Sequence, residues 1–307
     1  MKEDTFRFAA SDDHELYCYR WQPDGAPRAI VLVSHGMGEH AGRYSIFGEP
    51  LAERGYSVLA HDQRGHGLSA DDAGRGYLGA DGWSRLLEDL AELHRHLLDR
   101  NPGLPIVLFG HSMGSMAAMH YVQRYHEPLA ALVLSGTPGV GAPLQMFLSH
   151  TVARFERWRL GPTAESALMQ RLLFGDANKE FEGSTGFEWL SRDTIEVKRY
   201  MDDPFCGFVL RAGSLCELFA ASRAAAQPSA FAAIRKGMPV HVLVGSDDPV
   251  HAKQKNLTRL YARFEGAGVS PVTKRVYKSG RHEMLNETNR GDVINDIVKW
   301  LDGVTKG

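Results

Sequence analysis

Cysteine is scarce in this sequence of 307 residues. It has 3 cysteines, Cys18, Cys206 and Cys216, which are widely spaced and match no metal-ligand pattern. A small, odd number of scattered cysteines excludes a disulfide framework and is typical of a protein in a reducing compartment. Long apolar runs are also missing: no segment reaches transmembrane length, and the acidic start, 1–5, lacks the apolar stretch of a signal peptide. We therefore predict a globular, cytoplasmic protein.

Charge of one sign is not in excess either. The chain has 35 Lys and Arg against 37 Asp and Glu, with a formal net charge of -2. A protein that binds nucleic acid or another polyanionic substrate carries a clustered excess of basic residues. The balance predicts no nucleic-acid partner, while the sequence makes no prediction of the oligomeric state.

Motifs for metals and nucleotides are lacking or incomplete. His35 and His40 are spaced like a metal pair, but neither an HExxH motif nor a cysteine partner accompanies them. Residues 74–79 match GxGxxG formally, yet they follow the polar stretch 69–73 rather than a strand, so a phosphate-binding turn is not expected. We predict no metal and no cofactor.

What the sequence does contain is an alternation of apolar runs with helical patterns. Two alternating segments near the start predict a hairpin at a sheet edge, and helical patterns separate the later strands. With 43% hydrophobic residues, the chain can bury a substantial core. The alternation predicts an α/β fold with a mostly parallel, eight-stranded sheet and helices on both faces. The predicted strands are 5–9, 15–21, 29–33, 56–60, 106–109, 129–134, 239–244 and 272–277.

The strand pattern lapses after residue 136. From there to about 225 the sequence shows amphipathic helices, so we predict a core of 1–136 and 226–307 with an inserted helical cap, 137–225. The helices near 146–157 could also touch a membrane surface transiently, although docking onto the core is favoured. Apolar residues of this segment are numerous enough to line a groove, but most must pack its own helices: Phe147, Phe155, Trp158, Leu160, Phe174, Phe181, Phe187, Trp189, Phe205 and Phe208.

The pentapeptide GHSMG, 110–114, lies between a predicted strand and a predicted helix. Glycine two residues on either side of a serine permits a sharp, strained strand-to-helix turn that lifts the hydroxyl into a cleft. Ser112 is therefore the predicted nucleophile. An ordinary turn with a helix-capping serine is the alternative, and the flanking strand and helix argue against it.

A serine nucleophile needs a base, an acid and donors for the developing oxyanion. In the order serine, acid, histidine, the loops after the last two strands supply Asp248 as the acid and His282 as the base. Asp247 is the rival acid, but Pro249 favours Asp248 because it fixes the preceding residue in an extended conformation. The amides of Met113 and Met37 are the predicted oxyanion donors. We expect the neighbouring histidines to pack or to hold loops: His61, His66 and His111.

Several segments together resemble the monoacylglycerol lipase and lysophospholipase group of α/β-hydrolases, almost from end to end. They are SHGMGEHAGRY (34–44), DQRGHGLS (62–69), GHSMG (110–114) and HEMLNE (282–287), with FEWLSRD (187–193) and DPFCGF (203–208) in the predicted cap. The resemblance implies a helical cap on an α/β-hydrolase core, a triad of Ser112, Asp248 and His282, and oxyanion amides at Met37 and Met113. It suggests a head-group role for Glu39, His40 and Arg43.

The resemblance also implies a reaction, namely hydrolysis of a carboxylic ester on a lipid-like substrate through an acyl-serine intermediate and a water activated by His282. Our leading hypothesis is a serine carboxylester hydrolase acting on monoacylglycerols or lysophospholipids. A thioesterase, peptidase or acyltransferase of the same fold is the alternative reaction. A non-catalytic ligand receptor is a third hypothesis, against which the complete serine, aspartate and histidine set argues.

Overall fold

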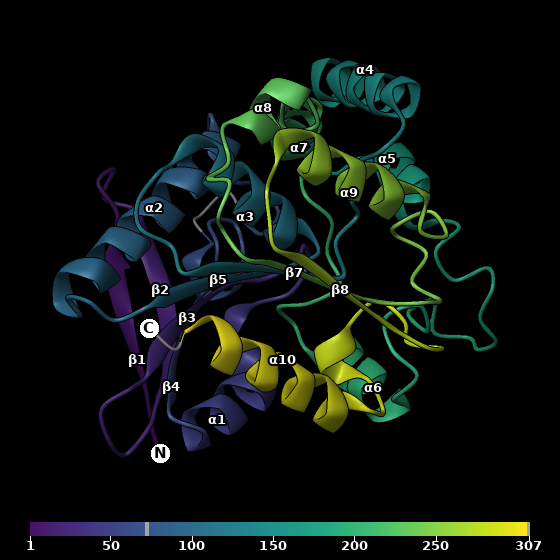
Figure 1. Cartoon of the computed structure of the whole chain (residues 1–307). Coiled ribbons are helices and arrows are strands. Elements are labelled where there is room, and N and C mark those ends of the chain that lie inside the picture. The colour runs from purple at the N-terminus through teal and green to yellow at the C-terminus, as the bar shows by residue number, and fades with distance from the viewer. Residues whose placement is uncertain (71–73, 306–307) are drawn as a thin grey trace.

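Eight strands form one twisted sheet through the middle of the molecule (Figure 1). The computed structural model describes residues 1–70 and 74–305; positions 71–73, part of the polar stretch before Gly74, and positions 306–307 lie outside the described residues. Along the sheet the strand order is β1-β2-β4-β3-β5-β6-β7-β8. The strands are β1 (Lys2–Ala9), β2 (Glu15–Gln22), β3 (Ala29–Ser34), β4 (Tyr56–His61), β5 (Ile106–His111), β6 (Ala131–Ser135), β7 (Val240–Gly245) and β8 (Val272–Tyr277).

Strand direction divides the sheet into two parts. The strands β1 and β2 form an antiparallel hairpin, and β2 is also antiparallel to β4. From β4 to β8 every neighbouring pair is parallel. The predicted mostly parallel, eight-stranded sheet is therefore present. Parallel strands end at the same edge, so the loops after β3, β5, β7 and β8 gather there.

Helices cover both faces of the sheet (Figure 1). On one face lie α1 (Ser45–Glu53) and α10 (Arg290–Val304), and on the other lie α2 (Gly82–Arg100), α3 (Met113–Arg124) and α9 (Lys255–Ala267). Successive side chains of a strand point to opposite faces. In β5, Val107 and Phe109 pack with α1 and α10, whereas Ile106 and Leu108 pack with α2, α3 and α9. Burial on both faces explains the continuous apolar runs.

The inserted segment, which we define as residues 137–225, is described throughout, and none of its residues lies in a strand. It contains α4 (Pro143–Leu160), α5 (Ala167–Phe174), α6 (Thr194–Asp202) and α7 (Ala212–Ala225), and α8 (Pro228–Ala232) follows it. Helix α4 packs on α7, which in turn contacts α2 and α3. The helix α7 therefore joins the inserted segment to the rest of the molecule.

The described part of the chain has three short 3-10 helices in its loops, η1 (Ala41–Tyr44), η2 (Gly67–Ser69) and η3 (Met284–Asn286). Two of them follow strands whose loops carry predicted site residues, because η1 comes after β3 and η3 comes after β8. Within the described ranges 1–70 and 74–305, no helix combines the length and the apolar character needed to cross a bilayer.

Candidate active site

Ser112 occupies a strained backbone position between β5 and α3. Its φ of 51° and ψ of -116° place it where residues other than glycine are rare. The turn leaves no room for side chains two residues before and after the serine: a Cβ at Gly114 would collide with the carbonyl oxygens of Ser34 and His35. At Gly110 an added Cβ would come within 2.5 Å of the carbonyl oxygen of Gly114. The two glycines of the motif are therefore required by close backbone approach.

A chain of hydrogen bonds joins the three residues that the motif order predicts. Nε2 of His282 lies 2.9 Å from Oγ of Ser112, and Nδ1 of His282 lies 2.9 Å from Oδ2 of Asp248. The other carboxylate oxygen of Asp248 accepts the backbone N–H of Val250 at 2.9 Å. Asp247, the rival acid, is exposed and accepts a hydrogen bond from Ser246. It is therefore Asp248 that contacts the imidazole.

The imidazole and the carboxylate are both buried, since His282 is 3% exposed and Asp248 is 2% exposed. Burial alone would lower the pKa of His282, but the charge and hydrogen bond of Asp248, together with the charges of Glu283 and Glu39, raise it above its usual value. Burial alone would likewise raise the pKa of Asp248, and the charge and hydrogen bond of His282 hold it below its usual value. The pair therefore favours an ionised carboxylate beside a basic imidazole.

The loop after β3 lies against the serine. A Cβ added at Gly36 would come within 3.3 Å of Cβ of Ser112, so the backbone next to Met37 passes close to the nucleophile. The loop is held on both sides. The N–H of Gly36 donates to Oε1 of Glu39 at 2.6 Å, and the carbonyl oxygen of Gly38 accepts from the Tyr200 hydroxyl at 2.9 Å and from the N–H of Gly207 at 3.0 Å.

The second predicted donor belongs to a helix terminus. Met113 is the first residue of α3, and its backbone N–H is one of the first four of the helix, which find no acceptor within the helix. The positive end of the helix dipole also favours negative charge at this place. The N-terminus of α3 thus offers an oxyanion a donor and a favourable potential directly beside Ser112.

A large cavity begins at Ser112. Its volume is about 1020 Å³, and Met37, Met113 and Asp248 line it together with the serine. One part is walled by α3, α4 and α7 and is rich in apolar and thioether side chains: Met116, Met119, Met146, Leu218 and Phe219. From the predicted apolar set of the inserted segment, Phe174, Phe181 and Trp189 line the cavity, whereas Phe147, Phe155 and Trp158 are exposed to solvent.

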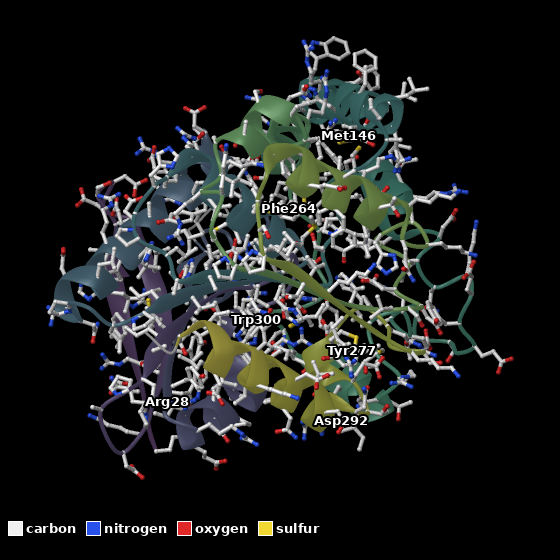
Figure 2. The ribbon with its side chains drawn as sticks, in the orientation of Figure 1. Arg28, Met146, Phe264, Tyr277, Asp292 and Trp300 are labelled. Carbon is white, nitrogen blue, oxygen red and sulfur yellow. The ribbon has the colours of Figure 1, made fainter. Side chains whose placement is uncertain are left out.

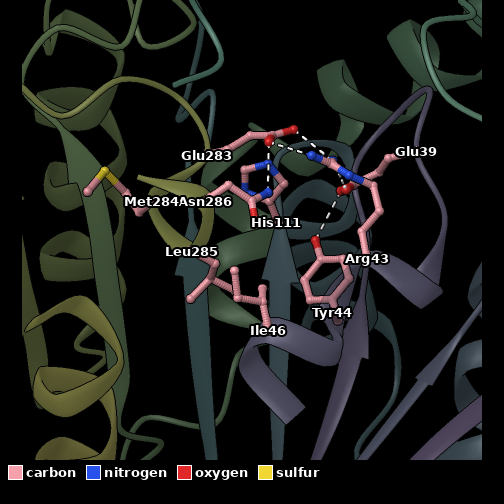
Figure 3. Close-up of a pocket in the computed structure, with 9 residues that line it drawn as sticks. All are labelled: Glu39, Arg43, Tyr44, Ile46, His111, Glu283, Met284, Leu285 and Asn286. Atoms are coloured by element: carbon pink, nitrogen blue, oxygen red, sulfur yellow. Dashed lines mark hydrogen bonds and ion pairs between the residues drawn. The ribbon is translucent and has the colours of Figure 1, made fainter. Parts of the chain in front are cut away.

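Glu39, His40 and Arg43, for which the resemblance suggested a head-group role, are not among the described residues that line this cavity. Glu39 and Arg43 instead border a small, nearly filled pocket of about 10 Å³ behind the loop, where they bind each other (Figure 3). His40 caps η1, since its Nδ1 accepts the N–H of Gly42, and its Nε2 lies 2.9 Å from Oδ2 of Asp203. The head-group role stays a prediction.

Donor atoms of His40, Asp203 and Cys206 converge within 4.8 Å of one another, a spacing that could hold a metal ion. Both ring nitrogens of His40 are already engaged, and burial raises the pKa of the Cys206 thiol, which disfavours the thiolate that metals bind. His35 is engaged as well: its Nδ1 lies 2.8 Å from the Gly36 carbonyl oxygen and its Nε2 accepts the N–H of Gln63. These contacts favour hydrogen bonding over metal ligation.

Two residues make contacts at the site that the sequence did not predict: Trp189, expected only as an apolar residue of the inserted segment, and Glu283. The Trp189 ring lies 5.0 Å from the His282 ring between centroids, and its carbonyl oxygen accepts the His282 N–H at 3.2 Å. The Glu283 carboxylate pairs with Arg43. Both residues lie in segments that carried the family resemblance, so the sequence did mark these segments. A single tryptophan or glutamate, however, does not show which residue it contacts.

Known proteins provide an independent comparison. A model of the family described as Serine aminopeptidase, S33, matches residues 25–289. The monoacylglycerol lipase of Mycolicibacterium smegmatis is 29% identical over 290 residues, which cover 92% of this chain and 90% of that protein. The human monoglyceride lipase is 26% identical over 302 residues, covering 97% of this chain and 90% of its own length.

Solved structures agree with these sequence relatives. A thermostable carboxyl esterase from Bacillus coagulans, solved in complex with glycerol, superposes with a TM-score of 0.90 at 27% identity and with 99% of both chains covered. The predicted fold and the predicted resemblance are thus confirmed. Because the family model matches most of the sequence, the chain belongs to the family described as Serine aminopeptidase, S33, and is an α/β-hydrolase similar to the monoacylglycerol lipases.

Proposed function

We propose that the chain is a serine carboxylester hydrolase that cleaves monoacylglycerol or lysophospholipid esters. The observation that carries the proposal is the hydrogen-bonded chain from Ser112 through His282 to Asp248, which opens into a cavity of about 1020 Å³. A serine beside an imidazole whose other nitrogen faces a buried carboxylate is the arrangement that activates a hydroxyl for attack on an acyl carbon.

The reaction follows from the positions of these atoms. Oγ of Ser112 attacks the ester carbonyl carbon while Nε2 of His282 takes the hydroxyl proton, and Asp248 holds the imidazole and stabilises its charged form. The N–H groups of Met37 and Met113 receive the oxyanion of the tetrahedral intermediate. Collapse of the intermediate releases the alcohol with the proton from His282. Water then attacks the acyl-serine while His282 takes one of its protons. As the second tetrahedral intermediate collapses, His282 gives that proton to Oγ of Ser112 and the fatty acid leaves.

The substrate class is supported by the wall of the cavity and by the relatives. The methionines and apolar side chains of α3, α4 and α7 suit an acyl chain, because thioether side chains are flexible and adapt to irregular apolar shapes. Two of the curated relatives are a monoacylglycerol lipase and a monoglyceride lipase. A monoacyl lipid ester would lay its single acyl chain against this part of the cavity wall, with its ester carbonyl at Ser112.

The inserted segment acts as a cap in this proposal, and its outer side contacts lipid transiently. The two faces of α4 support both roles. Its inner face lines the cavity with Gln145, Met146 and Ser149, and Figure 2 shows Met146 on the side of α4 that faces the body of the molecule. Its outer face carries large apolar side chains that are exposed: Leu144, Phe147, Leu148, Phe155 and Trp158. A cytoplasmic location remains a prediction from cysteine usage.

The reaction is tested with purified protein and a panel of substrates. We expect turnover of monoacylglycerols that Ser112→Ala lowers at least 1000-fold, because loss of the nucleophile leaves the oxyanion donors and binding alone. Matched thioesters and amides, including aminoacyl amides, compare the alternative reactions of the same fold. Turnover retained by Ser112→Ala, or faster cleavage of amides than of esters, would contradict the proposal.

A further inference from the structure

A buried trio of charges lies beside the triad. Arg43 stands between two carboxylates, with Nη1 2.6 Å from Oε2 of Glu39 and 2.8 Å from Oε1 of Glu283, and with Nη2 2.7 Å from Oε2 of Glu283 (Figure 3). Both carboxylates are buried, and Arg43 is nearly so. Buried groups stay charged when well-aligned ion pairs and further hydrogen bonds offset their loss of hydration. We call these three residues the charged trio.

The trio connects the two loops that flank the nucleophile. Glu39 belongs to the loop after β3, and its Oε1 accepts the N–H of Gly36 at 2.6 Å and the Tyr44 hydroxyl at 3.0 Å. Glu283 follows His282 directly, and its Oε2 accepts from Nδ2 of Asn286 at 2.8 Å. A single guanidinium therefore ties the backbone next to Met37 to the backbone that carries His282.

The trio also carries one net negative charge, because one guanidinium faces two carboxylates. Burial alone would raise the pKa of Glu39 and of Glu283, yet the charge of Arg43 holds both below the usual value. Burial and the charge of His282 lower the pKa of His111, whose ring borders the same small pocket. The nearby histidine therefore stays neutral and does not cancel the charge.

His282 is the group on which this charge acts. Its nitrogens contact Ser112 and Asp248, and its ring lies 4.9 Å from the His111 ring between centroids and packs beside Trp189. The charged groups around these contacts are Asp248 after β7, Glu39 and Arg43 after β3, and Glu283 after β8. The negative groups outnumber the positive ones. The balance favours an imidazolium, the form that exists while the tetrahedral intermediate is present.

We propose that Glu39, Arg43 and Glu283 act as positioning residues, which fix the loop of Met37 against the loop of His282 and leave one negative charge to stabilise the His282 imidazolium. The Arg43 guanidinium is held by the two carboxylates and lies over the Tyr200 ring, with Cζ 4.9 Å from the ring centroid. These contacts are internal to the protein, which separates this role from the head-group contact that the resemblance suggested. The inference rests on the proposed function, since it assigns the imidazolium a place in that reaction.

The isosteric change Glu283→Gln separates charge from shape. It keeps an oxygen that can accept from Arg43 and removes one negative charge near His282. We expect the acid limb of the pH profile of kcat/KM to move about 0.5 to 1 unit toward lower pH. The conservative change Arg43→Lys keeps the charge but loses the bidentate geometry, so kcat falls roughly tenfold while the acid limb stays in place.

A matched control is available elsewhere in the chain. Asp89 is buried and accepts from both Nε and Nη2 of Arg64, so Asp89→Asn also removes the negative charge of a buried carboxylate that pairs with an arginine. We expect the acid limb of the kcat/KM profile of Asp89→Asn to coincide with that of the unaltered protein. Should Glu283→Gln fold poorly, Glu39→Gln removes the other carboxylate of the trio and predicts a shift of the same sign.

A second readout needs no turnover. The ring proton signal of His282, identified by its loss in His282→Gln, titrates at lower pH in Glu283→Gln than in the unaltered protein if the trio acts as proposed. Unchanged titration in Glu283→Gln, or an acid limb that Asp89→Asn shifts equally, overturns the inference. Unaltered protein that hydrolyses no ester overturns the proposed function instead, and the titration still decides the electrostatic role of the trio.

Discussion

At the scale of single residues, backbone approach fixes the position of Ser112. Gly114 lies so near the carbonyl groups of Ser34 and His35, and Gly110 so near the backbone of Gly114, that neither position has space for a methyl group. The strain at Ser112 persists because these surroundings leave no alternative path for the chain. Position and reactivity of the hydroxyl thus depend on atoms that are not themselves reactive.

Substituting Gly114 tests this dependence. We expect Gly114→Ala to lower the free energy of unfolding by about 3 kcal/mol or more, because its Cβ meets rigid backbone atoms. Gly266 in α9 is the matched control, since a Cβ there meets nothing within 4 Å. Gly266→Ala should be neutral or stabilise by up to about 0.5 kcal/mol through higher helix propensity.

Urea unfolding followed by tryptophan fluorescence measures both values. Equal stability of Gly114→Ala and the unaltered protein would show that the turn can relax, and the requirement for glycine would then be wrong.

Residue identities at the site could be predicted to different extents. Ser112, Asp248 and His282 each lie in a turn or loop after a predicted strand, in a fixed order that a sequence pattern can reveal. The proline after Asp248 separated it from Asp247, and the structure places Asp248 against His282. The pairing of Arg43 with Glu283 joins residues 240 positions apart. Such a pair leaves no local pattern, because it depends on the packing of two loops.

At the scale of elements, the strands follow closely the apolar, β-branched runs that predict them. The two edge strands differ from the others, because five residues of β1 and four residues of β8, Thr273 to Val276, are exposed. Lysine and arginine on such an edge discourage pairing with another chain.

Helix α4 makes the clearest prediction at this scale. Leu144, Phe147, Leu148, Phe155 and Trp158 recur at helical spacing on its outer face, and Trp158 is 79% exposed. Figure 2 shows side chains standing out from α4 at the top of the molecule. The double change Phe155→Ser and Trp158→Ser should weaken binding to phosphatidylcholine vesicles roughly tenfold, since it removes two of the three aromatic side chains of the face.

Ile195 on α6 provides the control, because it is 63% exposed and lies on the other side of the sheet (Figure 1). Ile195→Ser should bind vesicles as the unaltered protein does. Cosedimentation with vesicles measures all three proteins. If the double variant binds as well as the others, the outer face of α4 is not the lipid contact.

At the scale of the whole molecule, the class of fold was predictable and the cavity was not. Alternation of strands and helices predicts a parallel sheet whose strand ends share an edge. The wall of the cavity combines α3 and α7 with loops near 174–189 and 246–256, and its shape depends on how these elements pack. The aromatic residues of the inserted segment could not be divided by sequence into those that face the cavity and those that face solvent. The spacing of apolar residues along a helix shows that one face is apolar, but it does not show which element packs on that face.

Labelling by a fluorophosphonate probe tests most directly whether Ser112 is activated. The probe reacts with a serine hydroxyl only when a base takes its proton and donors receive the phosphoryl oxygen, so it reports the whole arrangement. We predict a single adduct in the intact mass, mapped by peptide analysis to Ser112, absent in Ser112→Ala and formed far more slowly in His282→Ala. No adduct on the unaltered protein, or an adduct on another residue, would contradict the activation of Ser112.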